Sequence, residues 1–145
     1  MAINQFESRV ELTQEQLKGL FDKARPLGHQ APIKLRNGIQ LTPSRINCSH
    51  CDAPTPMARL RAQIVNDDTK TVTRCFMFSC CDRCGLYFAS AEAYVAKPFS
   101  AQLCMLIGDE WIPYYETKLS FMGCVQRVQN ALLSTVKNIV LRASN

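Results

Sequence analysis

Six of the eight cysteines in this 145-residue chain lie between positions 48 and 84, and their spacing is typical of metal ligands. The segment begins with the pair Cys48/Cys51 and ends with the pair Cys81/Cys84, which Gly85 follows. Two intervening residues let both sulfurs of a pair reach one ion, and Zn²⁺ prefers four thiolate or imidazole ligands in a tetrahedron. Gly85 can adopt the positive φ angle that such a turn often requires. The sequence therefore predicts one structural zinc ion bound by these four cysteines.

A second ligand set remains open, because Cys75 and Cys80 precede the second pair. In that set Cys48, Cys51, Cys75 and Cys80 bind the ion, with gaps of 23 and four residues. Adjacent Cys80 and Cys81 point in different directions in an extended chain, so we expect at most one of them to bind the same ion. A cysteine cluster without metal is the third interpretation. Cys104 and Cys124 lie in apolar surroundings and are expected to be small core residues.

No motif of an enzyme accompanies the cysteines. A catalytic zinc ion keeps one coordination position open, whereas four cysteines fill all of them. The chain has no HExxH motif, Walker-type loop or recognisable catalytic triad, and no βαβ unit that would place a thioredoxin-like pair. His50, between two ligands, is expected to be exposed or beside the site rather than bound. We therefore expect a protein that is not an enzyme.

The elements that position the cysteines are predicted from periodicity and turn residues. A capping box at Thr13 and Gln16 starts a helix that ends before Pro26. Asn37-Gly38 indicates a hairpin turn. Residues 58–65 and 70–79 are rich in β-formers and are predicted strands, with a short third strand at 85–90, one or two helical turns at 90–98, and a second hairpin from 101–107 and 111–116.

The last segment is predicted to be a long amphipathic helix. Apolar residues recur there at helical spacing, namely at Phe121, Val125, Val128, Leu132, Val136, Ile139 and Ala143. So wide a stripe must be covered by the rest of the chain or by a second copy. The predicted fold class is α+β, a small zinc-ribbon hairpin module with an N-terminal helix and this C-terminal helix. The parts are an N-terminal helix and hairpin (1–45), a zinc ribbon (46–98), and a hairpin plus helix (99–145), packed as one compact unit.

The charge distribution suggests an acidic partner. The chain has a net charge of +5 and a pI near 8.8, and no acidic residue follows Glu116. The two predicted ribbon strands carry cations suited to phosphates or to an acidic polymerase surface, at Arg59, Arg61, Lys70 and Arg74. The first residues do not have the pattern of a signal peptide, and no apolar run is long enough to cross a bilayer. We therefore expect a cytoplasmic protein (in the host cytoplasm if the chain is viral), without membrane contact and with reduced cysteines.

Two resemblances cover about residues 46–98. The knuckle Cys81-Asp82-Arg83-Cys84-Gly85 and the aromatic pair Tyr87-Phe88 resemble the second knuckle of zinc ribbons in transcription elongation factors and RNA polymerase subunits. In those factors an acidic pair at the hairpin tip reaches toward the polymerase active site, and Asp67-Asp68 occupies the corresponding predicted tip. This resemblance implies a zinc ribbon with RNA polymerase as its partner.

The second resemblance is to the Ogr/Delta zinc fingers, which are phage activators of late transcription. The spacing Cys48-x2-Cys51 and Cys75-x4-Cys80, with "ARLRAQIVNDDTK" between the pairs and Phe88 after them, is similar to their pattern. It implies a regulator that binds DNA or polymerase. The chain departs from that family by its additional Cys81/Cys84 knuckle and by long extensions on both sides.

The sequence thus leads to two functional hypotheses. The first is a non-enzymatic zinc-binding regulator, such as a phage-type transcription regulator, that binds nucleic acid or RNA polymerase. The alternative is a structural or assembly protein, in which zinc stabilises a small domain. In that case the C-terminal helix mediates homo-oligomerisation or attachment to a larger complex.

Overall fold

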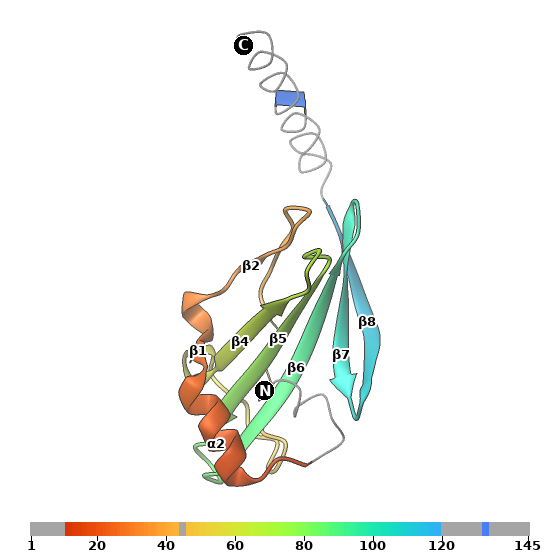
Figure 1. Cartoon of the computed structure of the whole chain (residues 1–145). Coiled ribbons are helices and arrows are strands. Elements are labelled where there is room, and N and C mark those ends of the chain that lie inside the picture. Colours follow the sequence, from red (N-terminus) through yellow and green to blue (C-terminus); the bar gives the residue numbers. More distant parts are fainter. Residues whose placement is uncertain (1–10, 44–45, 120–131, 134–145) are drawn as a thin grey trace.

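A computed structural model describes residues 11–43, 46–119 and 132–133 of the chain. Its main feature is a six-stranded antiparallel sheet in the order β1-β4-β5-β6-β7-β8, against which one α-helix and an irregular N-terminal segment pack (Figure 1). The sheet strands are β1 (Arg25–Pro26), β4 (Arg61–Asn66), β5 (Val72–Cys80), β6 (Tyr87–Ala96), β7 (Ser100–Ile107) and β8 (Glu110–Lys118). Strands β4 to β8 therefore form a continuous meander.

Helix α2 (Gln14–Lys23) covers part of one face of the sheet. The predicted capping box is confirmed, because the Gln16 N–H donates to Thr13 Oγ1 and the Thr13 N–H donates to Gln16 Oε1. Leu20 of the helix packs in one cluster with Phe76 and Phe78 of β5, and both rings are almost completely buried. This packing holds the helix against β5 and β6, toward the end of the sheet where β5 turns into β6 (Figure 1).

The opposite face is covered by the segment that leads from α2 to β4. It contains two 3₁₀ turns, η1 (Leu27–His29) and η2 (Met57–Arg59), and a two-stranded ribbon of β2 (Ile33–Lys34) and β3 (Gln40–Leu41). The hairpin predicted at Asn37-Gly38 is confirmed, with Ile33 opposite Leu41 and Gly38 at a φ of 88°. Apolar side chains of this segment pack on β5 and β6, so this face is the larger core.

The predicted fold class is wrong in two respects. The described residues form a mostly β protein with one α-helix, and the β4–β5 hairpin is an inner part of a six-stranded sheet rather than a separate zinc ribbon. The predicted helical turns at 90–98 are also wrong, because β6 continues as a strand to Ala96. Ala, Glu and Lys in that stretch favour a helix locally, but hydrogen bonding to β5 and β7 on both sides decides the conformation.

The predicted long C-terminal helix lies outside the described residues except for positions 132–133, and Cys124 lies outside them as well. The described residues contain no long helix. None of the helices it describes has the length and apolar character needed to cross a bilayer. The other predicted strands agree with the structure, including the hairpin with its turn at Gly108, where φ is 66°.

Candidate metal centre

Four cysteines meet at one end of the sheet. Cys48 and Cys51 belong to the loop between β3 and η2, and Cys81 and Cys84 belong to the turn that joins β5 to β6. The Sγ atoms of Cys48 and Cys84 are 3.7 Å apart, those of Cys51 and Cys81 are 3.5 Å apart, and all four lie within 4.8 Å of one another. With Zn–S bonds of about 2.3 Å, tetrahedral ligands are separated by about 3.8 Å. The four sulfurs therefore form a group that can hold a metal ion.

The two Cys-x-x-Cys turns, which we call knuckles, have the same backbone hydrogen bonds. In the first knuckle the Asp52 N–H donates to the Cys48 carbonyl, and in the second the Gly85 N–H donates to the Cys81 carbonyl, both at 2.8 Å. The N–H of the first cysteine in each knuckle donates to the carbonyl five residues later, from Cys48 to Ala53 and from Cys81 to Leu86. In each knuckle the residue after the second cysteine has a positive φ angle, 59° at Asp52 and 74° at Gly85. Two separate loops thus present their sulfurs in the same way.

Neighbouring groups orient the first knuckle. The N–H of His50 donates to Cys48 Sγ at 3.4 Å, an N–H···S contact that stabilises a thiolate. The His50 Nε2 atom lies 3.2 Å from the Tyr87 carbonyl oxygen, at the start of β6, and the residue is exposed. His50 is not in the four-residue ligand group, which agrees with its predicted position beside the site. His50 therefore links the first knuckle to β6, the strand that follows the second knuckle.

The local electrostatics differ among the sulfurs. The backbone N–H groups of Cys84 and Arg83 act against burial and lower the pKa of Cys81 to about 6. At Cys84 the Leu86 N–H also favours the thiolate, but burial and the neighbouring sulfurs outweigh it and raise the pKa to about 12. Without an ion, the cluster therefore accommodates one thiolate much more easily than several. A divalent cation removes the repulsion among thiolates, so binding it releases protons.

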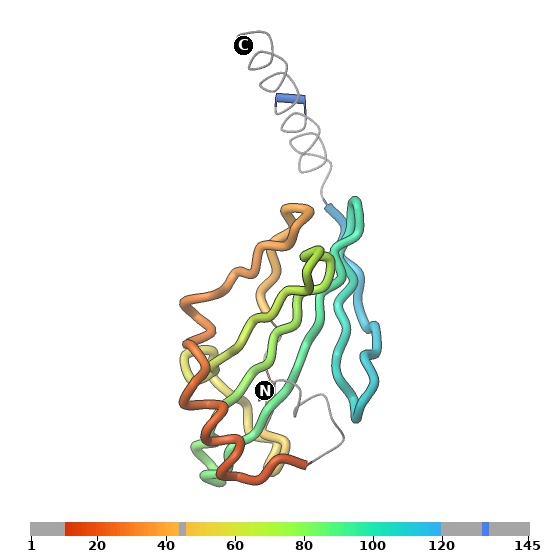
Figure 2. The backbone as a smooth tube through the Cα atoms, in the orientation of Figure 1, coloured from red at the N-terminus to blue at the C-terminus, as the bar shows by residue number. Residues whose placement is uncertain are grey.

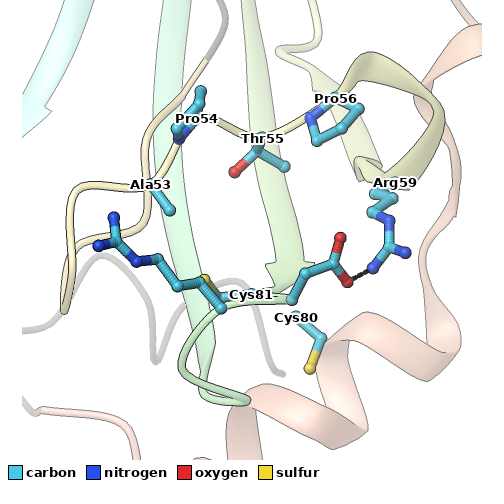
Figure 3. A pocket seen from close by; sticks show the side chains of 9 residues that line it. Ala53, Pro54, Thr55, Pro56, Arg59, Cys80 and Cys81 are labelled. Atoms are coloured by element: carbon cyan, nitrogen blue, oxygen red, sulfur yellow. Dashed lines mark ion pairs between the residues drawn. The ribbon is translucent and has the colours of Figure 1, made fainter.

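The alternative ligand pair is not brought to this group. Cys75 is completely buried in β5, where burial and then the nearby Glu92 carboxylate raise the pKa of its thiol to about 12. Cys80 points away from Cys81, and its Sγ lies 3.7 Å from the Gly85 carbonyl oxygen (Figure 3). Cys104 is a buried core residue, as expected. Of the two predicted ligand sets, the structure brings together the one with Cys81 and Cys84.

The four predicted partner-binding cations do not form one patch. Arg59 in η2 makes an ion pair with Asp82 of the second knuckle, across a cavity of about 160 Å³ that Ala53, Pro54 and Cys81 help to line (Figure 3). Arg61 lies 4.5 Å from the centre of the Phe21 ring, and Arg74 lies 5.9 Å from that of Trp111. Lys70 lies in the turn between β4 and β5, at the other end of the sheet from Arg59.

Two surfaces were not found from the sequence. Large apolar side chains are exposed along β7 and β8, with 57% of Ile107, 40% of Ile112 and 60% of Tyr115 accessible. Their apolar character was visible in the sequence, but not which strand would lie at the edge. Basic residues also gather at the end of the sheet opposite the cysteines, where Arg36, Lys97 and Lys118 lie in or beside turns that only the tertiary fold brings together.

Comparisons of the chain with models of protein families, with curated proteins and with solved structures find no match. The resemblances to zinc ribbons and to Ogr/Delta fingers therefore remain similarities of short motifs. The fold and the site define a mostly β protein with a four-cysteine centre that can hold a metal ion.

Proposed function

We propose that this chain is a non-enzymatic protein in which Cys48, Cys51, Cys81 and Cys84 hold one structural Zn²⁺ ion. The observation that carries this proposal is the closed set of four sulfurs, each within 4.8 Å of the others. Thiolates favour zinc among the common divalent metals, and two knuckles with N–H groups directed at sulfur are suited to it. Four protein ligands leave no coordination position for a substrate, so the metal stabilises the structure.

We further propose that the protein acts as a regulator that binds nucleic acid or RNA polymerase in the cytoplasm. Basic and acidic side chains nearly balance in the described residues, so most of the net charge of +5 comes from other positions, which include Arg127, Lys137 and Arg142. An acid-free basic segment beside a small folded domain suits a polyanionic partner. The motif similarity to transcription zinc ribbons and to the phage Ogr/Delta activators supports the same function, that of a phage-type transcription regulator.

Native mass spectrometry of the parent protein and of Cys81→Ser and Cys75→Ser variants tests the metal. We expect one zinc ion in the parent, its loss in Cys81→Ser, and its retention in Cys75→Ser. Loss in Cys75→Ser alone would select the other ligand set, and a parent without metal would refute the zinc proposal.

Binding to DNA, RNA and RNA polymerase, measured at low and at high salt, tests the function. We expect an affinity that falls steeply as salt rises, because cations on the protein displace counterions from phosphates. If no binding to any of the three is measurable at low salt, the regulatory function is wrong.

A second candidate function is that of a structural or assembly protein, and it is favoured by the exposed apolar side chains of Ile107, Ile112 and Tyr115. Leu132 and Leu133 of the last segment are also exposed, by 62% and 59%. In this case the last segment mediates oligomerisation or attachment to a larger complex. A chain truncated after Leu119 should then sediment as a monomer while the full chain sediments as an oligomer. Equal sedimentation of the two as folded monomers would count against it.

A further inference from the structure

Three turns meet at the end of the sheet opposite the metal centre, and together with the end of β8 we call this region the loop end. The turns are residues 35–39, 67–70 and 97–100, and Figure 2 shows them at the same extremity of the molecule. Arg36 Nη1 donates to the Thr69 carbonyl at 3.1 Å, and Asn37 Nδ2 donates to the carbonyls of Lys97 and Ser100 at 2.8 Å. The Leu119 N–H donates to the Phe99 carbonyl. Direct hydrogen bonds thus hold the three turns and the end of β8 together.

The loop end carries more cations than anions. Its exposed basic residues are Arg36, Lys70, Lys97 and Lys118, and exposed Lys34 of β2 lies just before the first turn. Its carboxylates are those of Asp67, Asp68 and Glu116. Asp67 stabilises its own turn, because its carboxylate accepts hydrogen bonds from the Val72 N–H and the Thr69 hydroxyl. The Glu116 carboxylate accepts from the Ser100 hydroxyl and lies 3.4 Å from Lys97 Nζ. Among the described residues, Lys70 and Lys118 form no ion pair. The Ser100 hydrogen bond and Lys97 lower the pKa of the Glu116 carboxyl, and Lys118 adds to this only from a distance.

Two of these cations, Arg36 and Lys97, line a hollow. A cavity of about 230 Å³ lies between the first and third turns, lined by Arg36, Asn37, Ala96, Lys97 and Pro98. Asn37 is buried and its amide is used in hydrogen bonds to the backbone, so it shapes the wall. Arg36 donates to the uncharged Thr69 carbonyl, so this contact does not neutralise its positive charge. The hollow therefore presents two cationic side chains from a preformed wall.

Two further features indicate which polyanion fits this surface. Phe99, next to Lys97 and Pro98 in the third turn, is 56% exposed. An exposed aromatic ring among cations is the combination that binds single-stranded nucleic acid, since bases stack on rings while the backbone follows the positive charges. In addition, the chain continues from Lys118 at this end into a sequence with three cations and no acid.

We propose that the loop end binds single-stranded nucleic acid, with phosphates at Arg36, Lys70, Lys97 and Lys118 and a base on Phe99. This inference rests on the proposed regulatory function and locates its nucleic-acid surface. It also places that surface at the other end of the sheet from Arg59, which pairs with Asp82 of the second knuckle, and from Arg61, which lies on the Phe21 ring of the helix. Of the four cations predicted from the sequence, only Lys70 belongs to the loop end.

The test compares two triple variants of the full zinc-loaded chain. The first, Lys70→Asn/Lys97→Gln/Lys118→Gln, removes three charges from the loop end, and Asn is chosen because Lys70 has a φ of 56°. The matched control, Lys18→Gln/Lys23→Gln/Arg25→Gln, removes three exposed charges elsewhere. Fluorescence anisotropy measures binding of a labelled oligo-dT of about 20 nucleotides, which exceeds one typical single-strand site. Duplex DNA and anionic phosphatidylserine vesicles serve as competing probes, and circular dichroism confirms folding.

We expect the loop-end variant to bind oligo-dT at least about tenfold more weakly at low salt, with the slope of log K against log salt reduced by about two for three lost contacts. Phe99→Ala should weaken oligo-dT binding without changing that slope, and the control variant should bind like the parent. If the parent binds oligo-dT and both triple variants bind it equally, the inference is wrong while the regulatory function stands. Preference of the parent for duplex DNA or for vesicles overturns the single-strand assignment. If the parent binds no nucleic acid, the inference also fails, and binding to RNA polymerase then decides the proposed function separately.

Discussion

The two ends of the sheet are held together by different means. At the metal end, two loops from distant parts of the chain meet through four sulfurs, which carry like charges once they ionise. At the loop end, three turns meet through hydrogen bonds from Arg36 and Asn37 to backbone carbonyls. If the proposed zinc ion is bound, the first arrangement depends on it, whereas the second is complete by itself. The zinc proposal therefore predicts that the metal governs stability at one end, while hydrogen bonds alone hold the turns at the other end.

Removing the metal should have the largest effect. Structural zinc sites in zinc-finger peptides contribute roughly 10 kcal/mol or more, which is comparable to the roughly 5–15 kcal/mol net stability of a whole domain. We expect chelation, or Cys81→Ser, to lower the unfolding midpoint by tens of degrees or to abolish the cooperative transition in calorimetry. Cys80→Ser is the matched control, since it changes the adjacent thiol outside the ligand group, and it should keep the metal and the midpoint.

Breaking the loop end should cost less but should not depend on metal. Asn37→Ala leaves the carbonyls of Lys97 and Ser100 and the Ile39 N–H without their amide partner. Because the side chain is buried, we expect a loss of about 2–3 kcal/mol in urea unfolding, with zinc stoichiometry unchanged. Asn47→Ala, which removes an exposed hydrogen bond to Asp52, should cost under about 0.5 kcal/mol. A loss of zinc in Asn37→Ala would show that the two ends are not independent.

Glycine substitutions compare the ends directly. Gly85 in the second knuckle and Gly38 in the loop end have φ angles of 74° and 88°, and a methyl group at either would meet no atom within 4 Å. Each change to Ala should therefore cost only the left-handed backbone strain, about 1–2 kcal/mol. In a chelator competition assay, Gly85→Ala should also weaken zinc binding and Gly38→Ala should not. Gly28→Ala, at a position without positive φ, is the control. Equal zinc affinities in all three variants would contradict the assigned role of Gly85.

The smallest effect concerns the pH dependence of the metal-free protein. The pKa of Cys81 is about 6, below the ordinary thiol value of 9.0, so its thiolate stabilises the folded state increasingly as pH rises from about 6 to 9, and this contribution is lost as pH falls through 6. Cys75, with a pKa of about 12, should remain a thiol over this range. Alkylation followed by peptide mass spectrometry should show Cys81 reacting half-maximally near pH 6 and Cys75 not reacting. Similar profiles for both thiols would contradict the assigned electrostatics.

Several elements could be predicted because their determinants are local. The capping box of α2, the turn at Asn37-Gly38 and the two-residue spacing of each cysteine pair depend on neighbours within a few positions. The preference for Cys81 and Cys84 rested on their two-residue spacing. The adjacency of Cys80 and Cys81 indicated only that no more than one of them would join the group, and the tertiary structure brings Cys81 to it. The helical interpretation of 90–98 was wrong because its residues favour a helix only until strands pair on both sides.

By itself the sequence determined the cysteine knuckles, the first helix, the hairpin turns and the excess of positive charge, all of which depend on residue type and short spacing. Only the tertiary structure decided that the β4–β5 hairpin lies inside a six-stranded sheet, because strand pairing is a long-range property. It likewise decided that Arg59 and Arg61 face Asp82 and Phe21, and that Arg36, Lys70 and Lys97 share the loop end. Charges far apart in sequence become one surface only when the turns that carry them are packed together.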